Sequence, residues 1–199
     1  MAGATPAPVA SPAADAPAVV FLGDSLTAGY GLDPDQAYPA LIQRRIDASG
    51  LRYRVVNAGV SGETSAGARR RIEWILGQPV AVLVVETGAN DGLRGQDPAA
   101  TAENIQAIID RARRQPSPPK VVLVGMEALP NYGADYGRRF REIYPRLARK
   151  NDVVLVPFLL EGVAGVSALN QADGIHPTAE GQRKLAETMW KALQPLLTS

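Results

Sequence analysis

The chain has 199 residues, 46% of them hydrophobic, and its 21 basic and 20 acidic residues nearly cancel. This length is enough for one sizeable core, and the balanced charge argues against nucleic acid or an anionic membrane as a partner. Cysteine is absent and there is one histidine, which excludes disulfides, thiolate nucleophiles and cysteine-bound zinc. We therefore expect a small-molecule partner, with no metal and no cofactor.

Residues 1–17 are rich in Ala and Pro and have neither the basic n-region nor the apolar h-region of a secretory signal. We predict a disordered leader there and a single folded domain over residues 18–199. Such a leader suits an exported protein whose signal has been removed, in the periplasm or secreted, and it suits equally a tag or linker on a cytoplasmic protein. No apolar run approaches the roughly 20 residues of a membrane span, and both a monomer and a small homo-oligomer stay open.

Five short, valine-rich apolar runs predict strands that are buried on both faces. They lie at residues 19–22, 53–56, 80–85, 121–124 and 153–156. Helical patterns alternate with these runs. The clearest helix begins after Asp97 as N-cap, with Pro98 as its first residue, a second covers residues 140–147 with a kink at Pro145, and a third covers residues 185–196. This alternation predicts a three-layer α/β/α sandwich around a mainly parallel sheet.

Polar loops follow the first three predicted strands. They are Gly-Asp-Ser-Leu at 23–26, Asn-Ala-Gly-Val-Ser-Gly at 57–62 and Gly-Ala-Asn-Asp at 88–91. Ligands of open parallel sheets bind beyond the carboxyl ends of the strands, so these loops are expected at one edge. Taken singly, each has an ordinary explanation: Asp24 or Ser25 as a helix cap, and the glycines and Asn90 as turn residues.

A fourth segment, Asp-Gly-Ile-His-Pro at 173–177, contains the one histidine of the chain. Asp173 stands three residues before His176, a spacing that allows its carboxylate to reach Nδ1 of the ring while Nε2 faces elsewhere. Ester hydrolysis needs a hydroxyl, a neutral base, a carboxylate that orients the base, and donors for the oxyanion. Because the four segments together contain all of these groups, their combination favours a serine hydrolase.

These four blocks, in this order, resemble those of the SGNH or GDSL hydrolases, and the resemblance extends from about Val19 to Leu197. Residues 92–95 and 129–133 resemble segments found in one branch of this family, which contains bacterial arylesterases, acyl-CoA thioesterase I and lysophospholipases. The resemblance implies the SGNH hydrolase fold, a flavodoxin-like five-stranded parallel sheet in the order 2-1-3-4-5. It also implies a reaction, the hydrolysis of aryl or alkyl esters, thioesters or lysophospholipids.

The resemblance further implies the role of each site residue. Ser25 is the nucleophile, His176 its general base and Asp173 the residue that orients the base. The oxyanion hole would consist of the backbone N–H groups of Ser25 and Gly62 and the side-chain amide of Asn90. Both the order of the blocks and the unique histidine support these assignments.

Apolar residues in the same loops are expected to bind the acyl or aryl group of the substrate. They are Leu93, Met126, Leu129 and Ile175. The preferred acyl length and leaving group stay open, because one methylene in such a pocket changes binding by only about 1–3 kcal/mol.

Three other functions compete with this interpretation. The same triad could act on acetylated sugars or transfer the acyl group to an alcohol. Sugar sites usually offer several aromatic platforms, whereas this chain has two tryptophans, both in helical patterns, and Trp74 is expected to pack in the core. The sugar substrate is therefore disfavoured. A flavodoxin-like binding module would make the Ser, Asn and His coincidence accidental. An α/β-hydrolase is excluded, since Thr27 stands where the G-x-S-x-G elbow requires glycine.

Overall fold

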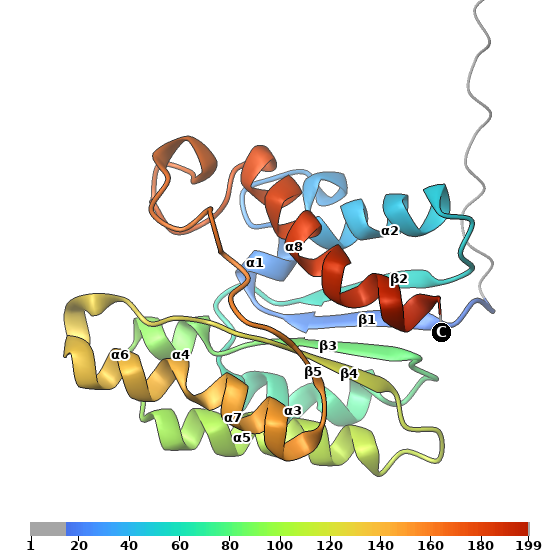
Figure 1. Cartoon of the computed structure of the whole chain (residues 1–199), viewed down its shortest axis with the longest axis horizontal. Coiled ribbons are helices and arrows are strands. Elements are labelled where there is room, and N and C mark those ends of the chain that lie inside the picture. Colours follow the sequence, from blue (N-terminus) through green and yellow to red (C-terminus); the bar gives the residue numbers. More distant parts are fainter. Residues whose placement is uncertain (1–14, 199) are drawn as a thin grey trace, which may run out of the picture.

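A computed structural model describes residues 15–198, so most of the predicted leader, residues 1–14, lies outside the described residues. A five-stranded sheet occupies the middle layer (Figure 1) in the order β2-β1-β3-β4-β5, and every pairing is parallel. The strands are β1 (Ala18–Gly23), β2 (Arg54–Gly59), β3 (Val82–Glu86), β4 (Lys120–Val124) and β5 (Val154–Val156). The predicted three-layer architecture and strand order are confirmed.

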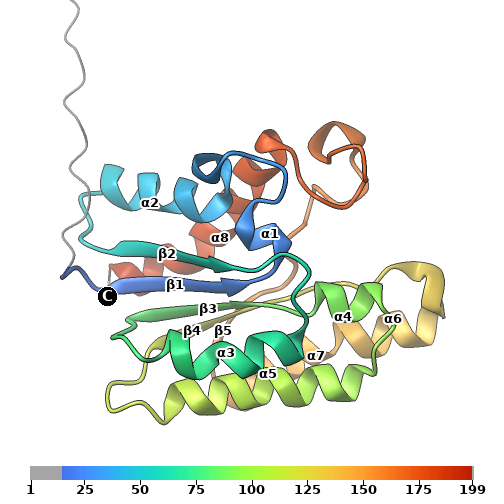
Figure 2. The same ribbon diagram turned by 180° about the vertical axis from the view of Figure 1, so that it is seen from behind.

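Helices cover both faces of the sheet (Figures 1 and 2). One face carries α1 (Ser25–Ala28), α2 (Tyr38–Ala48) and α8 (Ala179–Leu197). The other carries α3 (Ser65–Ile75), α4 (Ala89–Leu93), α5 (Pro98–Arg113), α6 (Gly133–Arg141) and α7 (Ile143–Asn151). Short 3-10 helices lie at η1 (Pro34–Gln36), η2 (Pro130–Tyr132) and η3 (Ser167–Leu169). No helix within residues 15–198 is both long and apolar enough to cross a membrane.

The central strands are continuous apolar runs because helices cover them on both faces. Every residue of β1 and β3 is buried, including Val19, Phe21 and Leu83, whereas the edge strand β2 is only partly buried. Burying such a side chain contributes about 1.5–3 kcal/mol relative to leaving it exposed. The parallel strands all end at one edge, where the loops that follow them meet.

Two local predictions are corrected. The third strand begins at Val82 rather than residue 80 and continues to Glu86. The predicted single helix with a kink at Pro145 is wrong, because its hydrogen-bond ladder is interrupted and α6 and α7 are separate helices on either side of Glu142. Proline has no backbone N–H, so Pro145 offers no donor to the carbonyl four residues earlier. Asp97 does cap α5, accepting a hydrogen bond from the Ala99 N–H at 3.0 Å.

The prediction that Trp74 packs in the core is wrong. Its side chain is 78% exposed, whereas Ile72 and Ile75 of the same helix are buried. At 100° per residue, position 74 points away from the stripe that Ile72 and Ile75 present to the sheet. Trp74 instead lines a shallow cavity beside β2, together with Val60 and Arg71.

Candidate active site

The turn that contains Ser25, the predicted nucleophile, connects the end of β1 to α1 and is called the nucleophile turn below. Asp24 caps that helix, since its Oδ1 accepts a hydrogen bond from the Leu26 N–H at 3.0 Å, and Ser25 is then the first helical residue. The turn also requires glycine at position 23. A Cβ there would lie 2.1 Å from Thr27 Oγ1 and 2.6 Å from Glu86 Oε2. Asp24 therefore supplies the cap, which leaves the hydroxyl of Ser25 free for other contacts.

Ser25, His176 and Asp173 form one chain of contacts. Nε2 of His176 lies 2.9 Å from Oγ of Ser25, and Nδ1 of His176 lies 2.6 Å from Oδ2 of Asp173. The other Asp173 oxygen accepts hydrogen bonds from the N–H groups of Ile175 and His176, at 2.9 and 3.0 Å. The hydrogen bond to the imidazole, followed by these two backbone N–H groups, holds the pKa of Asp173 well below its ordinary value. A permanent carboxylate favours the tautomer with the proton on Nδ1, which leaves Nε2 to accept from Ser25.

Two residues that were not anticipated from the sequence hold the histidine loop in place. Gln171 donates its backbone N–H to the His176 carbonyl at 2.7 Å, and its side-chain amide donates to the carbonyls of Tyr30 and Pro177 at 2.7 and 3.0 Å. The ring of Tyr30 packs against the imidazole, with 4.5 Å between centroids. Neither residue belongs to one of the four motifs, so the sequence carried no signal for them.

The predicted oxyanion donors lie on three neighbouring segments. Asn90 is in the first turn of α4, and its Nδ2 donates to the Glu63 carbonyl at 3.0 Å and lies 3.4 Å from Oδ2 of Asp24. Within residues 15–198, the backbone N–H groups of Ser25 and Gly62 have no hydrogen-bond partner. Gly62 has a φ of 80°, a left-handed conformation that is strained for residues with a side chain. Unpaired N–H groups of this kind suit the binding of a developing oxyanion.

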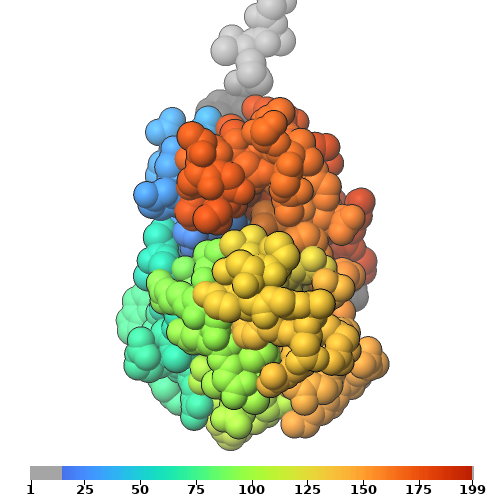
Figure 3. All heavy atoms as spheres, turned by 90° about the vertical axis from the view of Figure 1, so that its left-hand side faces the viewer, coloured from blue at the N-terminus to red at the C-terminus, as the bar shows by residue number. Residues whose placement is uncertain are grey.

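A cavity of about 260 Å³ opens beside Ser25 and Asn90. The four residues predicted to bind substrate all line it: Leu93, Met126, Leu129 and Ile175. Pro130 also lines it, as do Phe158 and Leu160, which were not predicted. Gly62 is not part of the lining, although Asn90 bonds to the residue that follows it. Figure 3 views this edge of the molecule, with the segment 160–176 on one side of a hollow and the segment 128–140 on the other.

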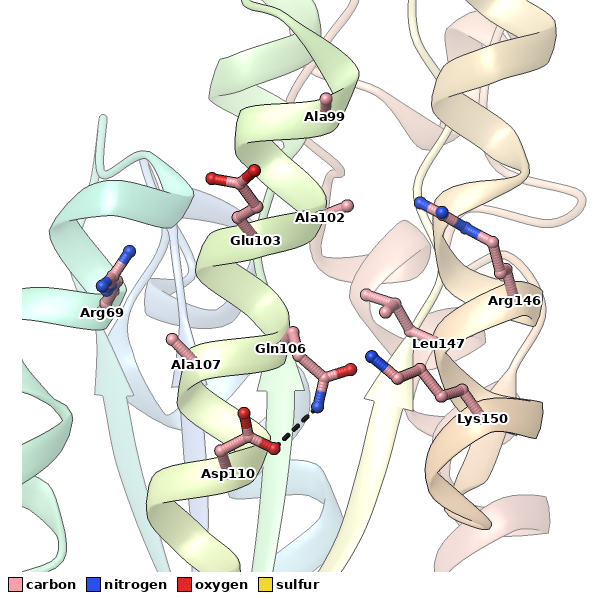
Figure 4. A pocket seen from close by; sticks show the side chains of 10 residues that line it. All are labelled: Arg69, Ala99, Ala102, Glu103, Gln106, Ala107, Asp110, Arg146, Leu147 and Lys150. Atoms are coloured by element: carbon pink, nitrogen blue, oxygen red, sulfur yellow. Dashed lines mark hydrogen bonds between the residues drawn. The ribbon is translucent and has the colours of Figure 1, made fainter.

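A larger groove of about 450 Å³ lies elsewhere, over α5 and α7 (Figure 4). Its charged lining is mixed, with Arg69, Glu103, Asp110, Arg146 and Lys150. Its lining contains neither a serine nor a histidine, and Gln106 donates to Asp110, one turn further along α5, at 2.8 Å. The smaller cavity, which Ser25 and Asn90 line, is therefore the candidate active site.

A largely buried ion pair joins the segment that contains Gly62 to β1. The guanidinium of Arg71, in α3, contacts the carboxylate of Glu63 at 2.6 Å and donates to the Gly23 carbonyl at 3.1 Å. The carbonyl of Glu63 is also the acceptor of the Asn90 amide. Glu63 thus connects the segment that contains Gly62 with β1 and with Asn90.

Known proteins resemble this chain over nearly its whole length. A model of the GDSL-like Lipase/Acylhydrolase family matches residues 21–184. The Esterase TesA of Pseudomonas aeruginosa is 44% identical over 92% of this chain and 91% of its own length. The Thioesterase 1/protease 1/lysophospholipase L1 of Escherichia coli is 40% identical over 93% of this chain and 87% of its own length. The Arylesterase of Vibrio mimicus is 36% identical over 85% of this chain and 84% of its own length.

Solved structures agree with these relationships. A crystal structure of TesA superposes with a TM-score of 0.86 at 44% identity, over 90% of this chain and 99% of that one. The structure of the esterase EstA from Pseudoalteromonas sp., inhibited by monoethylphosphonate, superposes with a TM-score of 0.85 at 31% identity. The match covers 92% of this chain and 99% of that one. The expected hydrolase family, fold and esterase activity are thereby confirmed. The chain belongs to the GDSL-like lipase/acylhydrolase family, and its activity is serine ester hydrolysis on small-molecule esters.

Proposed function

We propose that Ser25, His176 and Asp173 perform ester hydrolysis through an acyl-enzyme on Ser25. The observation that supports this proposal is the pair of contacts at 2.9 and 2.6 Å that connects the three side chains. Nε2 of His176 takes the proton as Ser25 Oγ attacks the acyl carbon, and it then delivers that proton to the departing oxygen or sulfur. A water molecule, deprotonated by the same nitrogen, then releases the acid.

The oxyanion of both steps is assigned to the backbone N–H groups of Ser25 and Gly62 and to the amide of Asn90. The two free N–H groups support this assignment, because they need not exchange an existing partner when charge develops. The amide of Asn90 is already held by the Glu63 carbonyl, which restricts its rotation. Its proton on the side of Asp24 makes only a long contact of 3.4 Å and is the one assigned to the oxyanion.

The acyl or aryl group is assigned to the apolar cavity beside Ser25. Met126 is buried and would form the inner wall, whereas Leu129 and Ile175 are 47% and 40% exposed and would form the rim. Leu93 completes the set that we assign to substrate. A single aromatic residue, Phe158, lines the cavity, which is a poor platform for sugar rings and favours acyl esters over acetylated carbohydrate.

The experiment is a panel of p-nitrophenyl esters with acyl chains of increasing length, measured with the wild type, Ser25→Ala and His176→Ala. Ser117→Ala, in the loop before β4, is the matched control for a serine distant from the cavity. Both site variants should lose turnover on every ester, while the control retains it. Unchanged turnover in Ser25→Ala or His176→Ala would refute the assigned roles. Acetyl release from xylan that exceeds release from aryl acetate would favour the carbohydrate substrate.

A further inference from the structure

Two buried acidic residues lie against the nucleophile turn, and the hydrolytic steps do not use them. Glu86, the last residue of β3, has no exposed surface, and Asp24 is 1% exposed. Oε2 of Glu86 accepts hydrogen bonds from the backbone N–H of Asp24 at 3.1 Å and from the hydroxyl of Thr27 at 2.7 Å. Glu86 therefore holds the residues on both sides of Ser25.

The two carboxyl groups differ in the donors that reach them. Asp24 accepts hydrogen bonds from the Leu26 N–H at 3.0 Å and from the Asn90 amide at 3.4 Å. Oε1 of Glu86 is buried and has no donor within residues 15–198. No Lys or Arg side chain of this part of the chain forms an ion pair with either group. A buried oxygen without a donor is costly when charged, so Glu86 is the member that this environment neutralises.

The two phenols around the pair supply no compensating charge. Tyr38, from α2, reaches the pair through Thr27, its phenol lying 2.7 Å from the Thr27 hydroxyl. Tyr144, from α7, donates to the Thr87 carbonyl at 2.9 Å. Burial is the main reason that the pKa values of both phenols lie well above their ordinary value, and the charge of the acidic pair adds to it. The remaining group that faces the pair is His176, whose charge favours ionisation of Asp24, but burial outweighs it and the pKa of Asp24 is raised.

We propose that Glu86 is a positioning residue that holds a proton at neutral pH, so that the pair carries one negative charge, on Asp24. A neutral Glu86 still accepts the hydrogen bonds of Asp24 and Thr27 but does not repel the carboxylate that caps α1 and contacts Asn90. Burial, with the charge of Asp24 as the next cause, raises the pKa of Glu86 well above its ordinary range, and burial raises that of Asp24 to about 6. The inference rests on the proposed roles of Ser25 and Asn90 for its effect on turnover.

A proton held in the folded state is absent from the unfolded chain at neutral pH, where both carboxyl groups are ionised. Folding therefore takes up one proton, and the unfolding equilibrium constant should rise about tenfold per pH unit through this residue above about pH 6, where Asp24 is already ionised. Glu86→Gln keeps the shape and the acceptor oxygen but cannot ionise. Glu86→Leu removes the acceptor as well. Glu103→Gln, in α5, is the matched control at an exposed glutamate.

The experiment measures urea unfolding against pH, and kcat and KM on a p-nitrophenyl ester, for the wild type and these three variants. Glu86→Gln should lose the tenfold dependence per pH unit, which Glu103→Gln retains, and should keep kcat within about fivefold of the wild type. Glu86→Leu should lose about a hundredfold in kcat with little change in KM, because the nucleophile turn is displaced.

Equal pH slopes for the wild type and Glu86→Gln would overturn the proposal, as would a loss of kcat in Glu86→Gln as large as that in Glu86→Leu. If Glu86→Leu does not fold, the proposal is decided by comparing how the unfolding equilibrium of Glu86→Gln and of Glu103→Gln depends on pH. The unfolding slope does not depend on which residue is the nucleophile. A failure of this inference is therefore distinguishable from a failure of the proposed function.

Discussion

Nε2 of His176 lies 2.9 Å from Oγ of Ser25, although 151 positions separate the two residues in the chain. The sheet explains this proximity. Ser25 directly follows β1, and the segment that contains His176 immediately precedes α8, which packs on the same face as α1 and α2 (Figure 1). Gln171 then ties this segment to Tyr30, five residues after Ser25. The contact between the predicted base and the predicted nucleophile is therefore held by the fold itself.

Asp173→Asn should reduce kcat by about 10⁴-fold with little change in KM. Asparagine keeps an oxygen for the N–H groups of Ile175 and His176, so the loop should stay folded. Its amide, however, would no longer hold the imidazole in the tautomer that accepts from Ser25. Steady-state kinetics on a p-nitrophenyl ester measure the effect, with Asp110→Asn in α5 as the control. A kcat within tenfold of the wild type, about 1.4 kcal/mol, would show that Asp173 does not orient the base.

Asn90→Ala should reduce kcat by about 10²–10³-fold and leave KM nearly unchanged, since the amide acts on charge that develops in the transition state. The same substitution removes the hydrogen bond to the Glu63 carbonyl, so circular dichroism must show an intact fold before the kinetics are compared. An increase in KM with unchanged kcat would mean that Asn90 binds the ground state instead.

Asp24→Asn should change how stability depends on pH. The folded pKa of Asp24 is about 6 and its ordinary value is 3.8, so between these values the unfolded chain has released a proton that the folded protein keeps. The stabilisation is complete below about pH 3.8 and is lost as pH rises through about 6, a total of about 3 kcal/mol. Asparagine keeps an oxygen that can cap α1 but does not titrate. Urea unfolding from about pH 4 to 7 should therefore show the wild type losing stability relative to the variant, and a constant difference would contradict the raised pKa.

Arg71→Leu should destabilise the protein by about 3 kcal/mol, because it leaves the Glu63 carboxylate largely buried without its partner. The Arg71 and Glu63 side chains are only 19% and 11% exposed. The control is Arg44→Leu. The side chains of Arg44 and its partner Asp35 are 59% and 72% exposed, so this ion pair should contribute less than about 1 kcal/mol to stability. Equal losses in the two variants, from denaturant unfolding at one pH, would show that the pair with Glu63 has no special structural role.

The sheet could be predicted because its signals are local. Each central strand is an uninterrupted run such as residues 82–85, and no competing helical pattern overlaps it. The errors arose where packing decides the outcome. Trp74 belongs to a correctly identified helix, but its direction depends on the phase of the apolar stripe, and the division between α6 and α7 depends on hydrogen bonds that Pro145 cannot complete.

The residues of the candidate site also divide into those that local sequence motifs predict and those that only the tertiary structure places. Ser25 and Asn90 lie in short motifs that follow strands, and His176 lies in a short motif before α8. The sequence therefore identified them, and their catalytic roles stay predictions. Glu86 ends an apolar strand and gives no sign that it faces the nucleophile turn. Tyr30 and Gln171 contact the histidine segment only through tertiary structure. The supporting contacts could not be predicted because no spacing within the chain encodes them.

The central claim is that Ser25 is the nucleophile, activated by His176. Mass spectrometry of the intact protein and of its peptides after treatment with a p-nitrophenyl phosphonate tests it most directly. A single adduct should form on Ser25, its formation should match the loss of esterase activity, and it should be absent in Ser25→Ala and slow in His176→Ala. An adduct on another residue that accompanies inactivation, or full hydrolytic activity in Ser25→Ala, would contradict the claim.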